Sequence, residues 1–557
     1  MDVRPKRIVV VGNGMVSHRL CKELVRRGLQ DICVLGEESY PAYDRIRLSQ
    51  GLGQGIDDLL LSPADWYRDQ DIDLRLGVRV VSIDRAAKTV LLAGGERIAY
   101  GTLILATGST PAMPLGLDLP SDPELRLRVS VFRNYSDLVR LSAVAGAGKR
   151  FAIVGGGLLG LETAKVLRDQ GCQIHLLESG NYLMSRQLDP GGAEVVRKHL
   201  EGLGIRVHLR HVGQAVRTAL RDAGEPTSLR LEFKGGIAPL SIDHVVIAAG
   251  IRPRDELARD AGLKVAARGG IVVDDVLRTS DPDIHALGEC ASHRGVCYGL
   301  VAPGYSMAAT LADSLSGKQA RFQGSDLSCQ LKLLGLPVTA IGAYDQEAEL
   351  VSKVVPGGRR TLMLDGRRVM GATAVGPWAQ LPRLHDMIKR GSAISQSQLR
   401  RFRKSGDVFG GSDLAAIQSW PAGAVVCNCA GVTRGQLSEC VALGHSDVAD
   451  LGEQTGAGQV CGSCKPLLGQ LVGEPVRDVS VFMRTAVLAI SALALMLGSA
   501  YMFLEPLEFA HSVQAARRGI DRLWRDDTIK QWTGYGLVAV SALGLLLSAR
   551  KRLRWFS

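Results

Sequence analysis

Short runs of β-branched and other apolar residues recur through the first half of the chain. They occupy residues 8–11, 32–35 and 102–106, and again residues 151–154, 173–177 and 244–249. A short apolar run without polar alternation is typical of a strand that is buried on both faces of a parallel sheet. The runs lie between longer helix-like stretches, so the pattern predicts an α/β fold in which one βαβ unit is followed by a second copy.

The first of these strands runs directly into a glycine turn and then a helix. Gly12 and Gly14 let the backbone turn sharply and approach a pyrophosphate at the N-terminus of that helix. Ser17 stands where a third glycine is usual, and its small side chain still permits close helix–strand packing. Glu37 follows the second strand, where a carboxylate can accept a hydrogen bond from a ribose hydroxyl. The spacing predicts a dinucleotide site, although an ordinary βα turn shares the pattern.

A second copy of the unit contains a complete G-x-G-x-x-G turn, formed by Gly155, Gly157 and Gly160. Its second strand ends at Glu178, and its last strand ends at Gly250. Two complete units favour two nucleotide sites over two ordinary turns. No Lys or Arg lies within residues 178–183 to meet a ribose 2′-phosphate, and the carboxylate would repel one, so we expect NADH rather than NADPH at this second site.

The length and charge of the chain narrow its class. At 557 residues it exceeds a single core, and three or four domains are expected. A net charge of +11 is compatible with nucleic acid, an anionic membrane or an acidic partner. We do not expect nucleic acid, because no aromatic-interleaved basic groove or helix-turn-helix signal is present. Eleven cysteines in a long chain favour reduced thiols and a cofactor site over a disulfide framework.

Four of the cysteines form the pattern C-x-C, 31 intervening residues and C-x-x-C, namely Cys427, Cys429, Cys461 and Cys464. Four thiolates suit either a tetrahedral zinc ion or a [2Fe-2S] cluster. Structural zinc usually takes paired ligands from C-x-x-C or wider spacings. The C-x-C pair therefore favours iron–sulfur, with zinc as the alternative.

Two charge-free segments follow the cysteines. Residues 485–504 and 532–549 are twenty and eighteen residues long, each near the length that spans a bilayer core. A basic cluster, Arg550-Lys-Arg-Leu-Arg554, follows the second segment and places both ends in the cytoplasm by its charge. We therefore expect two transmembrane helices and a multi-pass protein of the inner (cytoplasmic) membrane, with its catalytic domains facing the cytoplasm. Two buried helices of a soluble domain are the alternative.

The order of the motifs resembles a known family. Ala-Thr-Gly at residues 106–108, Ala-Ala-Gly at 248–250 and the Gly-Glu of residues 288–289 follow the glycine turns as in the two-dinucleotide-domain flavoprotein reductases. Gly-Asn-Gly-Met-Val, Pro-Ala-Tyr-Asp-Arg and Ala-Leu-Gly-Glu-Cys-Ala resemble the flavin-containing front half of the NAD(P)H nitrite reductase large subunit, over about residues 6–475. The cysteine run resembles bacterioferritin-associated-ferredoxin-like domains, which are small, helical and hold [2Fe-2S].

The resemblance implies FAD in the first site, with Glu37 at its adenosine ribose and Glu289 at its ribityl–pyrophosphate portion. It implies NADH in the second site, with Glu162 beside the nicotinamide. We take Glu162 and Arg45 as the catalytic candidates near the isoalloxazine. The cofactor-binding candidates are Gly12, Gly14, Ser17, Glu37, Thr107, Gly108, Gly155, Gly157, Gly160, Glu178, Gly250, Gly288 and Glu289, and the metal candidates are Cys427, Cys429, Cys461 and Cys464.

The expected fold is α/β, with two Rossmann-like domains of the FAD/NAD(P)-disulfide-reductase type and three further parts. The expected domains are an FAD-binding domain (1–123 and 248–318), an NADH-binding domain (124–247), an α+β domain with a basic helical stretch (319–412), a helical [2Fe-2S] domain (418–475) and a transmembrane hairpin with a basic tail (480–557).

These features predict a membrane-anchored NADH-dependent flavoprotein oxidoreductase. Electrons would pass from NADH to FAD, to the [2Fe-2S] cluster and then to a redox partner protein or a quinone at the membrane, in nitrogen-oxide or respiratory electron transfer. An NADH:quinone oxidoreductase is one alternative, and a redox-sensing or scaffold flavoprotein subunit is another. The sequence leaves the terminal acceptor and the oligomeric state open.

Overall fold

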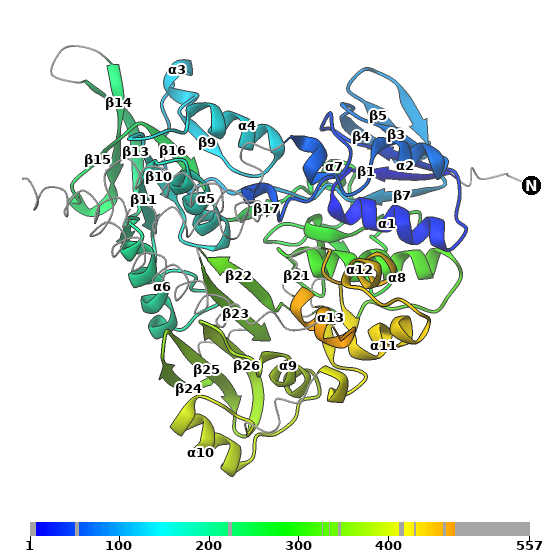
Figure 1. Cartoon of the computed structure of the whole chain (residues 1–557). Coiled ribbons are helices and arrows are strands. Elements are labelled where there is room, and N and C mark those ends of the chain that lie inside the picture. The colour runs from blue at the N-terminus through cyan, green and yellow to red at the C-terminus, as the bar shows by residue number, and fades with distance from the viewer. Residues whose placement is uncertain are drawn as a thin grey trace, which may run out of the picture. The chain divides into compact units, whose positions relative to one another are not determined.

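The first set of apolar runs forms a five-stranded parallel sheet in the computed structural model (Figure 1). Its strand order is β19 (Ile284–Ala286), β7 (Thr102–Leu105), β1 (Ile8–Val11), β2 (Ile32–Leu35) and β3 (Ile72–Arg75), and every neighbouring pair is parallel. Every residue of β1 and β2 is buried. One hydrophobic core joins these strands to helices α1 (Met15–Arg26) and α8 (Val301–Leu315), which explains why β1 and β2 lack polar alternation.

The second set of runs forms another five-stranded parallel sheet, which the chain builds between β7 and β19. Its order is β12 (Arg206–Leu209), β11 (Gln173–Glu178), β10 (Arg150–Val154), β16 (His244–Ile247) and β9 (Val129–Val131). Its four pairings are again parallel. Helix α5 (Leu158–Asp169) follows β10 as α1 follows β1. The predicted α/β fold with two Rossmann-like units is therefore confirmed, while the domain boundaries stay predictions.

The structure describes residues 7–50, 55–220, 226–325, 327–333, 335–342, 347–410, 417–427, 430–459 and 464–473. These residues belong to one of the two units into which the chain divides, residues 1–474. The other unit, residues 475–557, lies outside the described residues.

An antiparallel sheet follows α8. Its order is β22 (Cys329–Leu333), β23 (Leu336–Gly342), β26 (Arg368–Val375), β25 (Gly358–Asp365) and β24 (Glu349–Val355). The basic stretch after it forms two helices, α9 (Leu381–Lys389) and α10 (Gln396–Ser405). Ser395 and Gln398 form a capping box at the start of α10, and Gly406 ends that helix in the left-handed conformation.

The cysteine-containing segment folds as a small helical region. It contains β27 (Val425–Cys427), β28 (Val432–Thr433), α11 (Arg434–Ala442), α12 (Val448–Thr455) and α13 (Lys465–Leu471). Cys427 and Cys464 share its core with Leu437, Leu451 and Leu468.

The remaining elements complete the three larger parts. They are α2 (Ala64–Asp69), β4 (Val80–Asp84), β5 (Thr89–Leu92), β6 (Arg97–Ala99), β8 (Ser109–Pro111), α3 (Pro123–Arg126), α4 (Tyr135–Val144), α6 (Pro190–Gly202), β13 (Gly213–Leu220), β14 (Pro226–Phe233), β15 (Leu240–Ile242), β17 (Ile251–Pro253), α7 (Glu256–Asp260), β18 (Ile271–Val273), β20 (Ala291–His293) and β21 (Val296–Cys297).

The expected localisation, as a multi-pass protein of the inner membrane, is wrong, because the helices that the structure describes do not support it. Within those residues, no helix is both long enough and apolar enough to cross a bilayer. The longest of them, α8, has 15 residues, which at 1.5 Å per residue falls short of a hydrocarbon core of about 30 Å. Residues 485–504 and 532–549, on which the expectation rested, lie outside the described residues.

A buried carboxylate ties α1 to its neighbours. Glu23 accepts hydrogen bonds from Arg26 and Arg27 and forms an ion pair with Arg19. Its side chain is 5% exposed. Arg27 also donates to Asp313 of α8 at 2.9 Å. Burial by itself raises the pKa of Glu23, but the hydrogen bond from Arg27 and the charges of Arg19 and Arg26 outweigh it, so the pKa lies below its usual value.

We therefore expect Glu23→Ala to destabilise the protein by about 3–5 kcal/mol at pH 7, because the arginines lose a buried partner. A carboxylate with a lowered pKa stabilises the fold above its unfolded pKa of about 4.3, and this contribution disappears as the pH falls through the lower, folded value. The difference between variant and wild type in urea unfolding should thus shrink on acidification. Asp65→Ala, in the exposed Arg68–Asp65 pair, is the control and should cost less than about 1 kcal/mol. An equal effect of the two substitutions would contradict this reasoning.

Candidate functional site

The first glycine turn lies between β1 and α1, where the spacing predicts it. A Cβ on Gly12 would stand 2.3 Å from the carbonyl oxygen of Ala106, and the φ angle of Gly12 is +109°. Only glycine fits this position. Gly14 is the N-cap residue of α1, and nothing lies within 4 Å of the position its Cβ would take. The turn therefore leaves open space at a helix N-terminus, where backbone N–H groups attract phosphate.

A cavity of about 1240 Å³ opens over this turn. Typical ligand pockets measure roughly 300–1,000 Å³, so it has room for an extended dinucleotide. The buried hydroxyl of Ser17 has no hydrogen-bond partner within the described part of the chain, as expected where a ligand completes the site. The predicted residues in the cavity wall are Gly12, Gly14, Ser17, Glu37, Arg45, Thr107, Gly108, Glu162, Gly288 and Glu289. These residues fit a bound FAD.

Arg45 stands in a charged network at the wall of this cavity. It donates to Glu38, and Tyr43 donates to the other carboxylate oxygen of Glu38 at 2.6 Å. Arg45 also donates to the backbone oxygen of Arg133 at 3.4 Å, and the backbone N–H of Tyr135 donates to the Tyr43 hydroxyl at 3.0 Å. The loop that follows β2 is thereby fastened to the segment between β9 and α4.

A second ion pair in the wall joins Arg133 to Glu289. Ser109 donates to the same Glu289 oxygen at 2.7 Å, and Asp137 accepts the backbone N–H of Arg133 at 2.9 Å. Sequence reasoning found Glu289 but missed Arg133 and Glu38. Glu38 directly follows Glu37 and could have been found from the same position after the second strand, whereas no spacing marks Arg133, which reaches the cavity from a loop placed by the packing of the two sheets.

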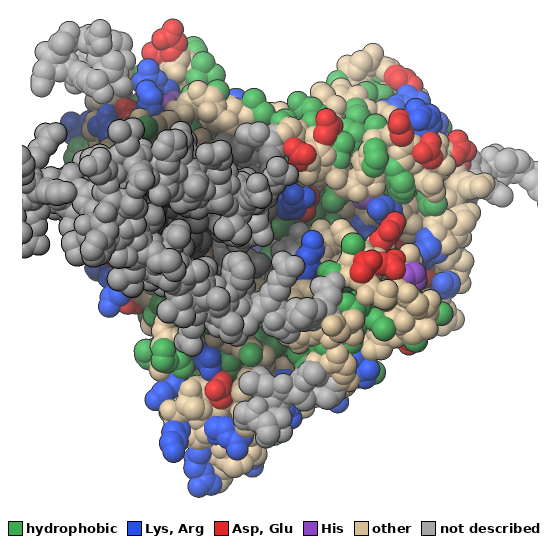
Figure 2. Space-filling view, viewed as in Figure 1, with side chains coloured by type: hydrophobic (Ala, Val, Ile, Leu, Met, Phe, Trp, Pro, Cys, Tyr) green, Lys and Arg blue, Asp and Glu red, His purple; other side chains and the backbone are tan. Residues whose placement is uncertain are grey.

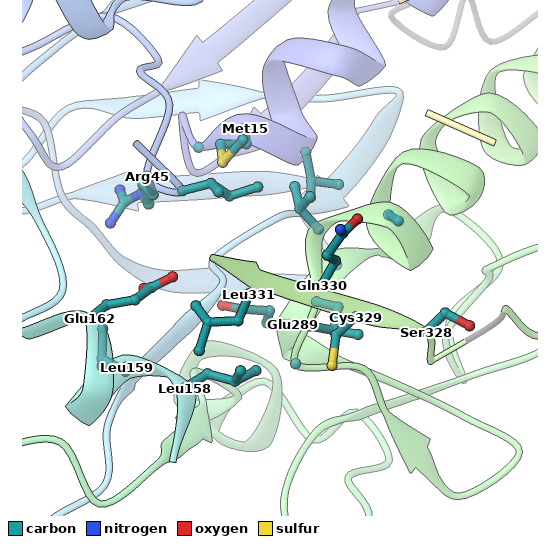
Figure 3. Close-up of a pocket in the computed structure, with 18 of the residues that line it drawn as sticks. Met15, Arg45, Leu158, Leu159, Glu162, Glu289, Ser328, Cys329, Gln330 and Leu331 are labelled. Atoms are coloured by element: carbon teal, nitrogen blue, oxygen red, sulfur yellow. The ribbon is translucent and has the colours of Figure 1, made fainter. Parts of the chain in front are cut away.

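Glu162 lies on α5 and faces the same cavity from the second unit. Figure 3 shows it opposite Met15 of α1, with Arg45 and Leu331 at the sides of the same space. Burial raises the pKa of Glu162 to about 7. Near neutral pH the carboxyl group is therefore present in both protonation states, which lets it either donate or accept a hydrogen bond.

The second glycine turn repeats the geometry of the first. A Cβ on Gly155 would stand 2.3 Å from the carbonyl oxygen of Ala248, and one on Gly160 would stand 1.8 Å from that of Gly155. Gly157 is the N-cap residue of α5 and has open space at its Cβ position. Gly250 follows β16 with a φ angle of +116°. The second turn is thus built for a second dinucleotide, on the argument used for the first.

Glu178 closes this second turn. Its carboxylate accepts the backbone N–H of Gly156 at 2.9 Å and that of Gly180 at 2.7 Å. A carboxylate held in this way lies beside the end of β11, where the ribose of a bound nucleotide is expected. In the first unit the corresponding Glu37 pairs with Arg254 at 2.7 Å.

Two of the four predicted metal ligands lie among the described residues. Cys427 ends β27, and Cys464 is the N-cap residue of α13. Both are buried in the same small core. Cys429 and Cys461 lie outside the described residues, within which no group of three or more His, Cys, Asp or Glu side chains is placed to hold a metal ion. One thiol of the C-x-C pair and one of the C-x-x-C pair thus share a small core, which is compatible with both pairs holding one cluster.

The cavity of the first turn also reaches this region. Cys464, Val426, Trp420 and Leu467 belong to its wall together with Glu162 and the residues of the FAD cradle. The structure therefore brings the flavin candidates, Glu162, Arg45 and one of the candidate metal ligands, Cys464, to a single cavity. Gly155, Gly157, Gly160, Glu178, Gly250 and Cys427 stand outside that wall.

Two nucleotide units that share a cavity define the class of the two-dinucleotide-domain oxidoreductases. Residues 6–312 match the pyridine nucleotide-disulphide oxidoreductase family, and the chain belongs to it. Residues 425–474 match the BFD-like [2Fe-2S] binding domain.

Known relatives agree with this assignment. The chain is 36% identical over 484 residues to the NAD(P)H nitrite reductase large subunit of Klebsiella oxytoca, covering 84% of this chain and 48% of that protein. It is 32% identical over 491 residues to the assimilatory nitrate reductase electron transfer subunit of Bacillus subtilis (strain 168), covering 84% of this chain and 60% of that one. The chain thus spans about half the length of these relatives.

A solved structure is similar over the larger part of the chain. The ferredoxin reductase for the CYP199A2 system from Rhodopseudomonas palustris aligns with a TM-score of 0.63 and 25% identity, covering 71% of this chain and 97% of that one. The protein is therefore an FAD-dependent NAD(P)H oxidoreductase that also contains a [2Fe-2S] domain, and the predicted cofactors FAD, NADH and [2Fe-2S] are confirmed.

The two glycines of the first turn differ in their surroundings, and this predicts different effects of the same substitution. Gly12→Ala forces a methyl group against the backbone at Ala106, which costs about 1–3 kcal/mol and should lower both the unfolding midpoint of the apoprotein and its affinity for FAD. Gly14→Ala meets no protein atom, so the unfolding midpoint should stay unchanged while FAD affinity falls about tenfold, because the methyl group takes the space of the phosphate. FAD titration and thermal unfolding measure both effects. Normal FAD affinity in Gly14→Ala would show that no phosphate lies at this helix end.

Proposed function

We propose that the protein passes electrons from NADH through FAD and the [2Fe-2S] cluster to a separate electron-accepting protein that reduces a nitrogen oxide. One observation carries this proposal: residues of the FAD cradle, Glu162 and Cys464 belong to the wall of one cavity. The two relatives named above act in nitrite and nitrate reduction, which supports the nitrogen-oxide acceptor. When bound, the flavin supplies the chemistry that converts a hydride into single electrons, and the cluster supplies one-electron transfer.

In this proposal the glycine turns and carboxylates hold the nucleotides. The N-terminus of α1 binds the FAD pyrophosphate between Gly12 and Gly14, Glu37 accepts a ribose hydroxyl, and Glu289 holds the ribityl–pyrophosphate portion. Thr107, Gly108 and Gly288 follow β7 and β19 and contribute backbone at the same edge of the sheet. Arg133 neutralises Glu289, which limits its repulsion of the phosphates.

The second unit binds NADH with the same parts. Gly155, Gly157 and Gly160 place the N-terminus of α5 at the pyrophosphate. Glu178 is held by two backbone N–H groups and presents a carboxylate where NADPH would place its 2′-phosphate. The repulsion between these anions supports a preference for NADH.

Glu162 and Arg45 act at the reacting rings. Glu162 faces the cavity from α5, so its carboxylate can stabilise the positive charge that develops on a nicotinamide ring as hydride leaves it. Arg45 is fixed by Glu38 and presents a cation from the opposite unit. In this proposal the two side chains supply opposite charges to the reacting rings during hydride transfer, which is supported by their place in the wall of one cavity.

The other functions receive less support. The quinone reductase alternative relied on a membrane anchor that no described helix provides. Disulfide reduction is not proposed, since Cys21 and Cys33 of the first unit are both fully buried in its core. A redox-sensing subunit needs no group poised at the rings, whereas Glu162 has a pKa raised to about 7 by burial beside the flavin cradle.

The cluster is tested through Cys427. We expect Cys427→Ser to lower the EPR signal of the NADH-reduced protein about tenfold or more, because four thiolates are needed to hold the cluster. FAD content and the rate of flavin reduction by NADH, followed by anaerobic stopped-flow absorbance, should stay within about twofold.

NADPH in place of NADH should reduce the flavin more slowly.

Cys440→Ser is the matched control, since Cys440 lies on α11 of the same domain but outside the C-x-C and C-x-x-C pattern. It should leave the EPR signal unchanged. Stoichiometric zinc without iron in the wild type, or a full cluster signal in Cys427→Ser, would contradict the assignment. Failure of NADH to reduce the flavin would overturn the proposed function itself.

Glu162 gives a pH-dependent prediction. Because burial raises its pKa to about 7, the carboxyl group ionises as the pH rises through neutrality, and the rate of flavin reduction should rise with it. Glu162→Gln stays neutral, so its rate should be flat across pH 6–8 and about tenfold below wild type at pH 8. Glu124→Gln, exposed on α3, is the control. A pH profile of Glu162→Gln that matches wild type would exclude Glu162 from this role.

A further inference from the structure

The positive charge of the chain is concentrated in one segment. Residues 349–410 contain twelve Lys and Arg side chains against four Asp and Glu, a net charge of +8, whereas the whole chain has +11. The segment is about a ninth of the chain. Such a concentration of one charge is typical of a surface that binds an oppositely charged partner, because dispersed charges are sufficient for solubility.

Several cations of this segment are exposed on its two helices. α9 and α10 pack on the same antiparallel sheet and share one core, in which Leu384 and Phe402 are fully buried. Their opposite sides face solvent. Figure 2 shows blue side chains gathered at the lower end of the view, where Figure 1 places α10. We call this surface the basic face; it is formed by the exposed Arg383, Lys389, Arg390, Arg400, Arg403 and Lys404.

Few carboxylates offset the basic face. Asp386 pairs with Arg390 at 3.0 Å, and Glu349 approaches Arg403 at 4.0 Å. Among the described residues, these two ion pairs with six cations leave a positive excess. Arg400, Arg403 and Lys404 stand at helical spacings of three and four, so they emerge from one side of α10.

The basic face borders the cluster region. α9 packs against β27, the strand that ends at Cys427. Arg383 belongs both to the basic face and to the wall of the cavity that Cys464 also lines. A macromolecule bound to the basic face therefore lies next to the region that contains Cys427 and Cys464.

The aromatic residues of the segment separate two classes of acidic partner. Trp378, Phe402 and Phe409 are buried beneath the helices at 4%, 0% and 5% exposure. Single-stranded nucleic acid is held by basic grooves together with exposed aromatic rings on which bases stack, and these three rings are not exposed. The basic face fits a folded protein with an acidic surface better.

We propose that the basic face is the docking surface for the acidic side of the electron-accepting protein. This inference rests on the proposed function and adds the partner's charge and its place of contact. Opposite charges steer the encounter and orient the partner over the cluster region. Each NADH oxidised to NAD⁺ and H⁺ reduces two molecules of a one-electron acceptor, which take one electron each.

The test uses the full chain and two probe proteins, a plant-type [2Fe-2S] ferredoxin, which is acidic, and mitochondrial cytochrome c, which is basic. NADH-driven reduction of each is followed anaerobically over a series of salt concentrations, and binding of oxidised ferredoxin is measured by calorimetry. We expect ferredoxin to bind at low salt and its kcat/KM to fall steeply as salt rises, whereas that of cytochrome c does not fall.

The variant R400E/R403E/K404E should lower kcat/KM for ferredoxin about tenfold or more and raise it for cytochrome c. R400Q/R403Q/K404Q keeps α10 free of new acidic groups near its C-terminus, and should give an intermediate loss. The control R68E/K198E/K318E makes the same change of net charge at side chains that are 74%, 72% and 67% exposed elsewhere, and should change kcat/KM less than about twofold.

Three outcomes would contradict the proposed docking surface. The proposal is overturned if wild type does not bind ferredoxin at low salt, if the control variant loses as much as the α10 variants, or if a single-stranded oligonucleotide binds the basic face more tightly than ferredoxin does. Flavin reduction by NADH is measured on every variant. If that step is absent in wild type, the proposed function fails; if it is normal while ferredoxin shows no preference, only the docking surface is wrong.

Discussion

Both nucleotide sites depend on the close approach of a glycine to a neighbouring backbone. At Gly12 and at Gly155, a single Cβ would lie 2.3 Å from a carbonyl oxygen, that of Ala106 in one unit and that of Ala248 in the other. This approach lets the turn pass beneath the adjacent strand end and directs the next helix N-terminus at the ligand. The same constraint is met twice because the chain builds the same unit twice, with the second placed between β7 and β19 of the first.

The constraint is local, and for that reason the sequence predicts it well. A glycine required by a 2.3 Å approach lies immediately after its strand, so spacing alone locates Gly12, Gly155 and the two helices that follow. The three middle strands of each parallel sheet are equally visible, since a strand covered on both faces must be largely apolar. These middle strands and both glycine turns were therefore predictable from periodicity and glycine positions, whereas the edge strands β19, β3, β12 and β9 were not predicted.

The parts that sequence reasoning missed depend on contacts between distant segments. Arg133 reaches Glu289 across 156 positions, and Arg45 reaches the backbone of residue 133 across 88. Neither contact leaves a spacing signal, because packing of the two sheets decides which loops meet. The membrane expectation is a separate case: it rested on residues 485–504 and 532–549, which lie outside the described residues, and no described helix has both the length and the apolar composition to span a bilayer.

Residues of both nucleotide units and of the cysteine-rich region line the same cavity. Glu162 belongs to the second unit, Glu289 to the first and Cys464 to the cysteine-rich region, yet all three border one space. In a water-filled gap the charges of Arg45, Arg133 and Glu289 would be screened, whereas the ion pairs at this wall are more than two-thirds buried and keep their influence. The same burial that raises the pKa of Glu162 thus strengthens the fields that act on the reacting rings. In the proposed function, nucleotide binding and the protonation of Glu162 are therefore linked through the walls of one cavity, so a substitution at one wall is expected to alter the other property.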